Sequence, residues 1–124
     1  MRSSKVNSSM VTFFFEKTGK IHGTGTYTWP DGRVYTGQWR DNLMNGDDSK
    51  FTWPDGRTYE GGYKDDKKHG WGVFKWPSGK EYRGYWHEGK QHGNGELWNA
   101  ENGTHVAGKW SMGKQYESEG KRVV

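Results

Sequence analysis

The 124-residue sequence has no cysteine, which excludes disulfide bonds and cysteine-ligated zinc. It is also poor in hydrophobic residues, at 29%. Its longest apolar run, Val11–Phe15, is far too short to span a bilayer. With so few aliphatic side chains, the chain cannot form a thick core of Leu, Ile and Val.

Aromatic residues and glycines are abundant instead. The chain carries 8 Trp, 7 Tyr, 5 Phe and 20 Gly, which is too many rings for a solvated tail and too many glycines for a helical domain. Each buried ring covers on the order of 150–250 Å². The composition therefore predicts strands joined by tight turns, with a core made mostly of ring surface.

An internal repeat organises these residues. The pattern aromatic-x-Gly-x-aromatic occurs at Tyr35–Trp39, Tyr59–Tyr63 and Tyr82–Trp86, with a degenerate copy at Val106–Trp110. The copies begin 23 or 24 residues apart. Self-similarity at a fixed period of this length predicts a repeat architecture.

Each copy has a second half that begins with His-Gly or Asn-Gly and runs into a turn. His22-Gly23 and His69-Gly70 are followed by Gly, an aromatic residue and a Trp-Pro-x-Gly segment. Proline presets φ at the first central position of a turn, and glycine accepts the positive φ that follows. The residues expected to build the repeat are Tyr35, Gly37, Trp39, Gly46, Tyr59, Gly61, Tyr63, Gly70, Gly72, Tyr82, Gly84, Trp86, Gly93, Gly95, Gly108 and Trp110.

This pattern resembles the MORN (membrane occupation and recognition nexus) repeat, whose signature is similar to Tyr-x-Gly-x-Trp followed by a turn and a Gly-x-Gly. The resemblance covers nearly the whole chain. The predicted fold is all-β: an elongated, single-layer antiparallel sheet of tandem β-hairpin repeats. Predicted units lie at 11–34, 35–58, 59–81, 82–105 and 106–120, with flexible tails at 1–10 and 121–124.

Residues at period two lie on one face of a strand, so rings and glycines share one face and mainly polar residues the other. A glycine between two aromatics leaves room for a neighbouring ring to lie flat on the backbone. The ring face then has two alternatives. Either the rings cover one another, or a groove stays open for a peptide, a partner helix or a second copy.

The sequence contains no pattern that favours a catalytic function. His22, His69 and His92 occupy equivalent positions, but such positions are about 10 Å apart across a repeat, whereas zinc needs its ligand atoms about 2 Å away. No phosphate-binding loop or catalytic constellation is present. We therefore expect no enzyme activity, catalytic residue, metal, cofactor or small-molecule substrate.

The net charge of +4 is small for a chain of this length. Basic and acidic residues cancel along both turn edges, which argues against nucleic-acid binding. A local excess at Lys64, Lys67 and Lys68 marks candidate lipid contacts. Trp71, Tyr85 and Trp98 lie out of phase with the ring positions, on the nominally polar face, and are the candidate partner contacts.

The resemblance implies a scaffold or protein-interaction module that positions partners at cytoskeletal or membrane-associated structures in the cytoplasm. Two alternatives stay open. One is a phosphoinositide or anionic-membrane binding module, and the other is a regulatory segment related to the repeats of phosphatidylinositol phosphate kinases or a lysine methyltransferase. Open strand edges at both ends also predict self-association.

Overall fold

The computed structural model describes residues 9–11, 14–15 and 20–118, and side chains within the last of these ranges. These residues form one antiparallel sheet. Its strands are β1 (Ser9–Val11), β2 (Phe14–Phe15), β3 (Ile21–Thr28), β4 (Val34–Arg40), β5 (Leu43–Met44), β6 (Gly46–Thr52), β7 (Thr58–Lys64), β8 (Lys67–Lys75), β9 (Lys80–His87), β10 (Lys90–Asn99), β11 (Thr104–Ser111) and β12 (Lys114–Ser118).

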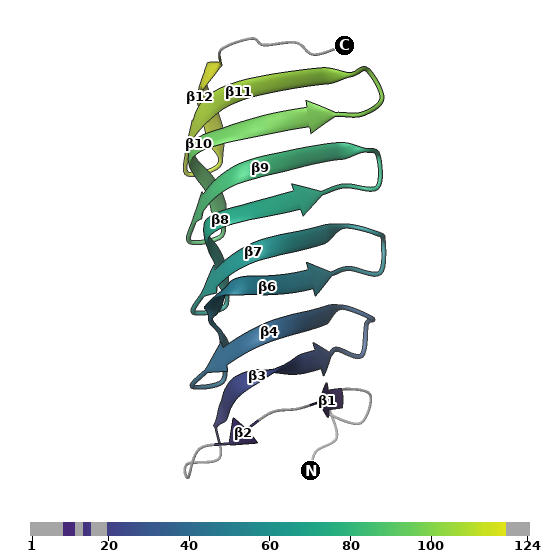
Figure 1. The fold of residues 1–124 in the computed structure, drawn as a ribbon, viewed down its shortest axis with the longest axis vertical. Coiled ribbons are helices and arrows are strands. Elements are labelled where there is room, and N and C mark those ends of the chain that lie inside the picture. Colours follow the sequence, from purple (N-terminus) through teal and green to yellow (C-terminus); the bar gives the residue numbers. More distant parts are fainter. Residues whose placement is uncertain (1–8, 12–13, 16–19, 119–124) are drawn as a thin grey trace.

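The strands follow one another along a single axis as curved rungs in one layer (Figure 1). From β6 to β12 each strand pairs with its neighbours in sequence, so every connection is a hairpin. The described residues contain no helix, and so none able to cross a membrane. The predicted fold class is confirmed.

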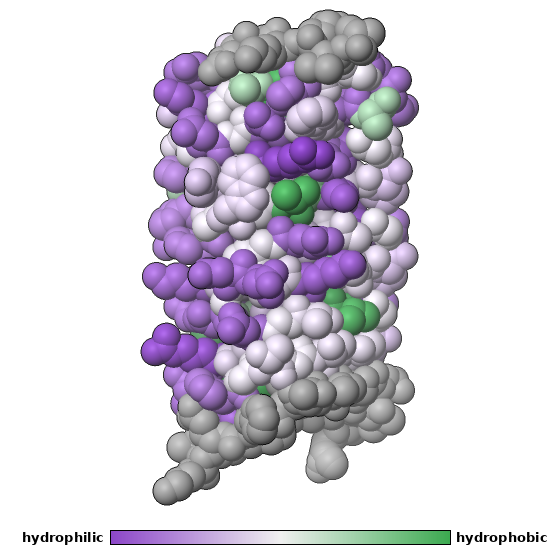
Figure 2. All heavy atoms as spheres, in the orientation of Figure 1, coloured by the Kyte–Doolittle hydropathy of each residue, from purple (hydrophilic) through white to green (hydrophobic). Residues whose placement is uncertain are grey.

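Alternation along the strands separates the two faces. In β4 the buried residues Tyr35, Gly37 and Trp39 alternate with the exposed Thr36 and Gln38. We call the face that carries the buried rings the ring face, and the opposite face the polar face. Figure 2 shows one side of the molecule, on which hydrophilic side chains predominate and hydrophobic ones are isolated. The buried hydrophobic residues are Tyr35, Trp39, Met44, Phe51, Tyr59, Tyr63, Phe74, Tyr82, Trp86 and Trp110.

Of the two alternatives for the ring face, the structure shows mutual coverage. Tyr59 is fully buried, with ring centroids 5.3 Å from Tyr63 and 5.6 Å from Trp86, both edge-on. Tyr82 repeats this arrangement with Trp86 at 5.2 Å and Trp110 at 5.1 Å. A ring of one repeat thus packs on a ring of the next, and this explains how a single sheet obtains a core.

A row of glycines crosses the sheet beneath these rings. Gly61 pairs with Gly72, Gly72 with Gly84 and Gly84 with Gly95. A Cβ added at Gly95 would lie 2.5 Å from the hydroxyl oxygen of Tyr82, so the ring occupies the space that a side chain would take. The predicted use of glycine is confirmed. At the corresponding point of β6, Ser49 replaces glycine, and its hydroxyl lies 2.8 Å from that of Tyr35.

The Trp-Pro-x-Gly segments are turns, as predicted. Gly32 has φ of 101°, and its N–H donates to the carbonyl of Trp29 at 3.0 Å. The Asp31 carboxylate accepts from the backbone N–H and the guanidinium of Arg33, and Arg33 lies 4.9 Å above the Trp29 ring. The backbone hydrogen bond is the main reason that the pKa of Asp31 is lowered.

The N-terminal edge of the sheet consists of two short strands, and the apolar run Val11–Phe15 is not one continuous strand. Instead, β1 pairs with one end of β3 and β2 with the other, joining Val11 to Thr26 and Phe15 to Ile21. Ser9 and Met10, placed in the tail by the sequence analysis, belong to β1. The remainder of the predicted tails, 1–8 and 121–124, lies outside the described residues.

The hairpin turns at the edge of the sheet opposite the Trp-Pro-x-Gly turns form backbone hydrogen bonds that join successive repeats. The carbonyls of Ile21, Met44, Lys68 and Gln91 accept from the backbone N–H of Asn42, Asp66, Gly89 and Gly113, at 2.7–3.0 Å. These four acceptors therefore occupy equivalent positions in four repeats, where the chain leaves a turn and enters the second half of the pattern. Of the four, only Lys68 is charged.

Candidate interaction surface on the polar face

The largest exposed rings of the polar face lie side by side. Trp71 on β8 and Tyr85 on β9 are cross-strand partners, with ring centroids 5.4 Å apart and planes at 78°. Their exposed fractions are 52% and 49%, whereas the rings of the core are below 9%. The sequence predicted both as partner contacts, and the structure brings them together into one apolar patch.

The third predicted contact, Trp98, is held differently. Its indole stacks on the imidazole of His105 at 4.0 Å, and the Arg83 guanidinium lies 4.6 Å from its ring centroid. The indole N–H donates to the Glu96 carboxylate at 3.3 Å. Trp98 is therefore partly buried, and its ring packs against His105 and Arg83, so it is less accessible to a partner than Trp71 or Tyr85.

Charged side chains of β9 and β10 lie between the two groups of rings. Arg83 forms an ion pair with Glu81 on its own strand, and Glu96 lies 3.3 Å from the Nε2 atom of His105. Sequence reasoning did not identify Arg83, Glu96 or His105. Period-two alternation places them on the polar face, but their proximity to Trp98 depends on cross-strand register, which the repeat pattern alone does not give.

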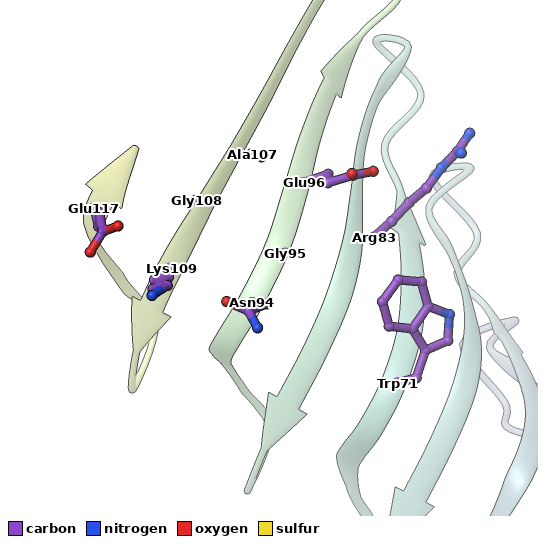
Figure 3. A pocket seen from close by; sticks show the side chains of 9 residues that line it. All are labelled: Trp71, Arg83, Asn94, Gly95, Glu96, Ala107, Gly108, Lys109 and Glu117. Carbon is purple, nitrogen blue, oxygen red and sulfur yellow. The ribbon is translucent and has the colours of Figure 1, made fainter. Parts of the chain in front are cut away.

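A shallow hollow opens beside Trp71. It has a volume of about 250 Å³, and Gly95 and Gly108 contribute to its lining. Figure 3 shows the indole of Trp71 beside Arg83, with the side chain of Glu96 extending toward β9. Lys109 and Glu117 line the far side. The hollow has an aromatic wall and charges of both signs, which suits one protruding side chain of a protein better than an anionic surface.

The three candidate lipid-contact lysines do not form one patch. Lys64 and Lys67 are exposed cross-strand partners at the turn between β7 and β8. Lys68 is on the ring face, where its ammonium lies 5.3–5.7 Å from the centroids of four rings: Trp53, Tyr59, Phe74 and Trp86. Burial lowers the pKa of Lys68, and the nearby charge of Arg57 lowers it further.

Replacing Lys68 with methionine is expected to raise the free energy of unfolding by about 1 kcal/mol at neutral pH. Met44 already fills the equivalent position, and burial lowers the pKa of Lys68 because its ammonium has lost part of its hydration. The gain should shrink as pH rises toward 10.5, because the wild-type amine then becomes neutral in both states. Urea unfolding of Lys68→Met, with the exposed Lys67→Met as control, measures this; an equal gain in both variants would contradict it.

The histidines at the repeat positions are not arranged as ligands of one metal ion within residues 20–118. In residues 20–118, no three side chains of His, Asp or Glu are placed to hold one ion. His69 and His92 each lie near His87, with ring centroids 5.4 and 5.5 Å apart. His92 also accepts a hydrogen bond from the backbone N–H of Met112 at 3.2 Å, which ties one turn to the next.

Together the hairpin rungs, the glycine row and the self-covering rings define an open antiparallel repeat solenoid. A family model described as MORN repeat matches residues 18–32, 35–46, 59–81 and 82–104, more than half of the chain. The chain therefore belongs to the MORN repeat family. No curated protein sequence matches it.

Proposed function

We propose that this chain is a non-catalytic protein-interaction module that binds a partner protein through the polar face of β8–β11. The observation that carries the proposal is the exposed pair Trp71 and Tyr85 beside the hollow. Trp, Tyr and Arg are the residue types that dominate binding energy in protein interfaces, and Arg83 lies within the same surface. A partner side chain in the hollow would be enclosed by Trp71 and flanked by groups of both charges.

Rigidity supports the same assignment. Trp71 and Tyr85 extend from the middle of paired strands, so little backbone entropy is lost when a partner binds. Arg83 is already fixed by Glu81 and by the Trp98 ring. A module of this kind would act as a scaffold, because its contribution is to hold a partner at a set place along the array.

Proximity labelling in the source cell tests the proposal. The double variant Trp71→Ser/Tyr85→Ser is expected to reduce labelling of a defined set of proteins at least tenfold, since hot-spot aromatics commonly contribute about 2 kcal/mol or more each. Tyr116→Ser is the matched control, because Tyr116 is 64% exposed on β12 and does not line the hollow. If the double variant labels the same proteins as strongly as the control, this surface is not the binding surface.

A further inference from the structure

Lys68 is the one charged residue among the four equivalent positions at the repeat junctions. The others are Ile21, Met44 and Gln91, and all four make the same backbone hydrogen bond to the next repeat. The ring packing therefore does not require a cation here. Burial also lowers the pKa of Lys68, so its charged form has lost part of its hydration. A charge that the fold does not need suggests a role in binding.

The surroundings of Lys68 leave its charge unpaired within the described part of the chain. Among residues 20–118, no group forms a hydrogen bond or an ion pair with its ammonium. The side chain is only partly buried, so a partner can reach it. By contrast, Arg33 and Arg57, at the Trp-Pro-x-Gly turns, are paired with Asp31 and Asp55 at 2.8 Å. Lys68 thus offers an ammonium that aromatic rings orient but no carboxylate neutralises.

We propose that the ring face at Lys68 binds a carboxylate of a partner protein, carried by a segment whose apolar side chains lie on Trp53 and Trp76. Both indoles are partly exposed. The Trp53 ring lies 5.7 Å from the Lys68 ammonium, and Trp76 packs at 4.6 Å on Phe74, whose ring lies 5.5 Å from the same ammonium. The low-polarity ring wall would strengthen a charge pair with Lys68, and this pair would replace the hydration that the ammonium has lost.

A single carboxylate fits this place better than a lipid surface does. Membrane attachment through headgroups takes several cations in one plane, each contributing about 1 kcal/mol. On this part of the ring face the other nearby cation, Arg57, is already paired with Asp55, and Lys64 and Lys67 are at a turn edge. One unpaired charge among rings is complementary to one acidic side chain with apolar neighbours.

The test uses the full chain and a library of random peptides displayed on phage. Peptides selected against the wild type are expected to share an Asp or Glu flanked by apolar residues. Their affinity should fall about 30-fold or more for Lys68→Met, and equally when the shared acid is replaced by its amide. Combining both changes should weaken binding no further, because either one removes the same charge pair.

Matched variants separate this proposal from the other surfaces. Lys67→Met, at an exposed position one residue away, should bind the selected peptides as the wild type does. So should Trp71→Ser/Tyr85→Ser, which disables only the polar-face patch. Peptides without a shared acid, an undiminished affinity for Lys68→Met, or a selection that yields no binder would each overturn the proposal. It would equally be overturned if phosphatidylserine vesicles, and no peptide, bound the wild type and not Lys68→Met.

Discussion

Replacing Gly84 with alanine is expected to lower the free energy of unfolding by about 3 kcal/mol or more. A Cβ at this position would lie 2.6 Å from the Cα of Gly95 and 2.7 Å from the carbonyl oxygen of Asn94. Both are backbone atoms of the neighbouring strand, so the clash cannot be relieved by a side-chain rotation. The third near atom is the hydroxyl of Tyr82, also 2.7 Å away, whose ring is held by Trp86 and Trp110.

Gly70 serves as a control that separates the steric cost of an added Cβ from the cost of backbone strain. Gly70 has φ of 79° and no atom within 4 Å of the place where a Cβ would be. Gly70→Ala should therefore cost only the strain of the left-handed backbone, about 1 kcal/mol. Urea unfolding of both variants against the wild type gives the comparison. If Gly84→Ala costs no more than Gly70→Ala, the glycine row is not a packing device.

The ring positions and the glycine row could be predicted from the sequence because both are local. Tyr82, Gly84 and Trp86 are two residues apart, so any extended strand places them on one face. The repeat then fixes the neighbour of each ring, since a copy of the same strand must lie beside it. The expected ring-on-glycine contacts of Tyr59 and Tyr82 required no further information.

The candidate surfaces were harder to predict because they depend on register between strands. The pattern placed Trp71, Tyr85 and Trp98 on the polar face, but it could not show that the first two are cross-strand partners while Trp98 stacks on His105. Bulges add to the difficulty: the pairing of β9 with β10 shifts between Gln91 and Gly95.

Lys68 was grouped with Lys64 and Lys67 because the three lie close together in sequence. A signal for its true position did exist. Counting back by two from Phe74 through Gly72 and Gly70 reaches Lys68, which places it on the ring face, and its repeat equivalents Ile21 and Met44 are apolar. Net charge over a short segment says nothing about which face each side chain occupies, and in a strand that face changes at every residue.

The protein is expected to unfold in alkaline solution between about pH 10 and pH 12, because its core contains buried tyrosines. Burial raises the pKa of Tyr82 to about 12 and those of Tyr59 and Tyr63 well above their usual range. The pKa of Tyr35 is raised as well, chiefly by burial. In the unfolded chain these groups titrate near 10.

The sign follows from proton counts. Above about pH 10 the unfolded chain releases these protons while the folded chain keeps them, so stability is complete below pH 10 and is lost as pH rises. Each tyrosine contributes at most about 1.4 kcal/mol per pH unit, and four contribute roughly 5 kcal/mol per unit. Lys68 acts in the opposite sense, but it is one group and its effect ends near pH 10.5. The tyrosines therefore dominate, and over the two units from pH 10 to pH 12 they can remove about 10 kcal/mol, which is comparable to the whole stability of a small domain, about 5–15 kcal/mol.

Urea unfolding at a series of pH values, followed by tryptophan fluorescence, measures this loss. Tyr82→Phe is the informative variant, because it keeps the ring and removes one titrating group together with its hydrogen bond to the carbonyl of Tyr85. It should be less stable than the wild type at neutral pH by about 1 kcal/mol. Above pH 10 the free energy of unfolding of this variant should then fall less steeply than that of the wild type, by about 1.4 kcal/mol per pH unit, because one titrating group fewer contributes. A wild-type stability that stays level to pH 12, or identical slopes in the two proteins, would show that the buried hydroxyls do not control alkaline unfolding.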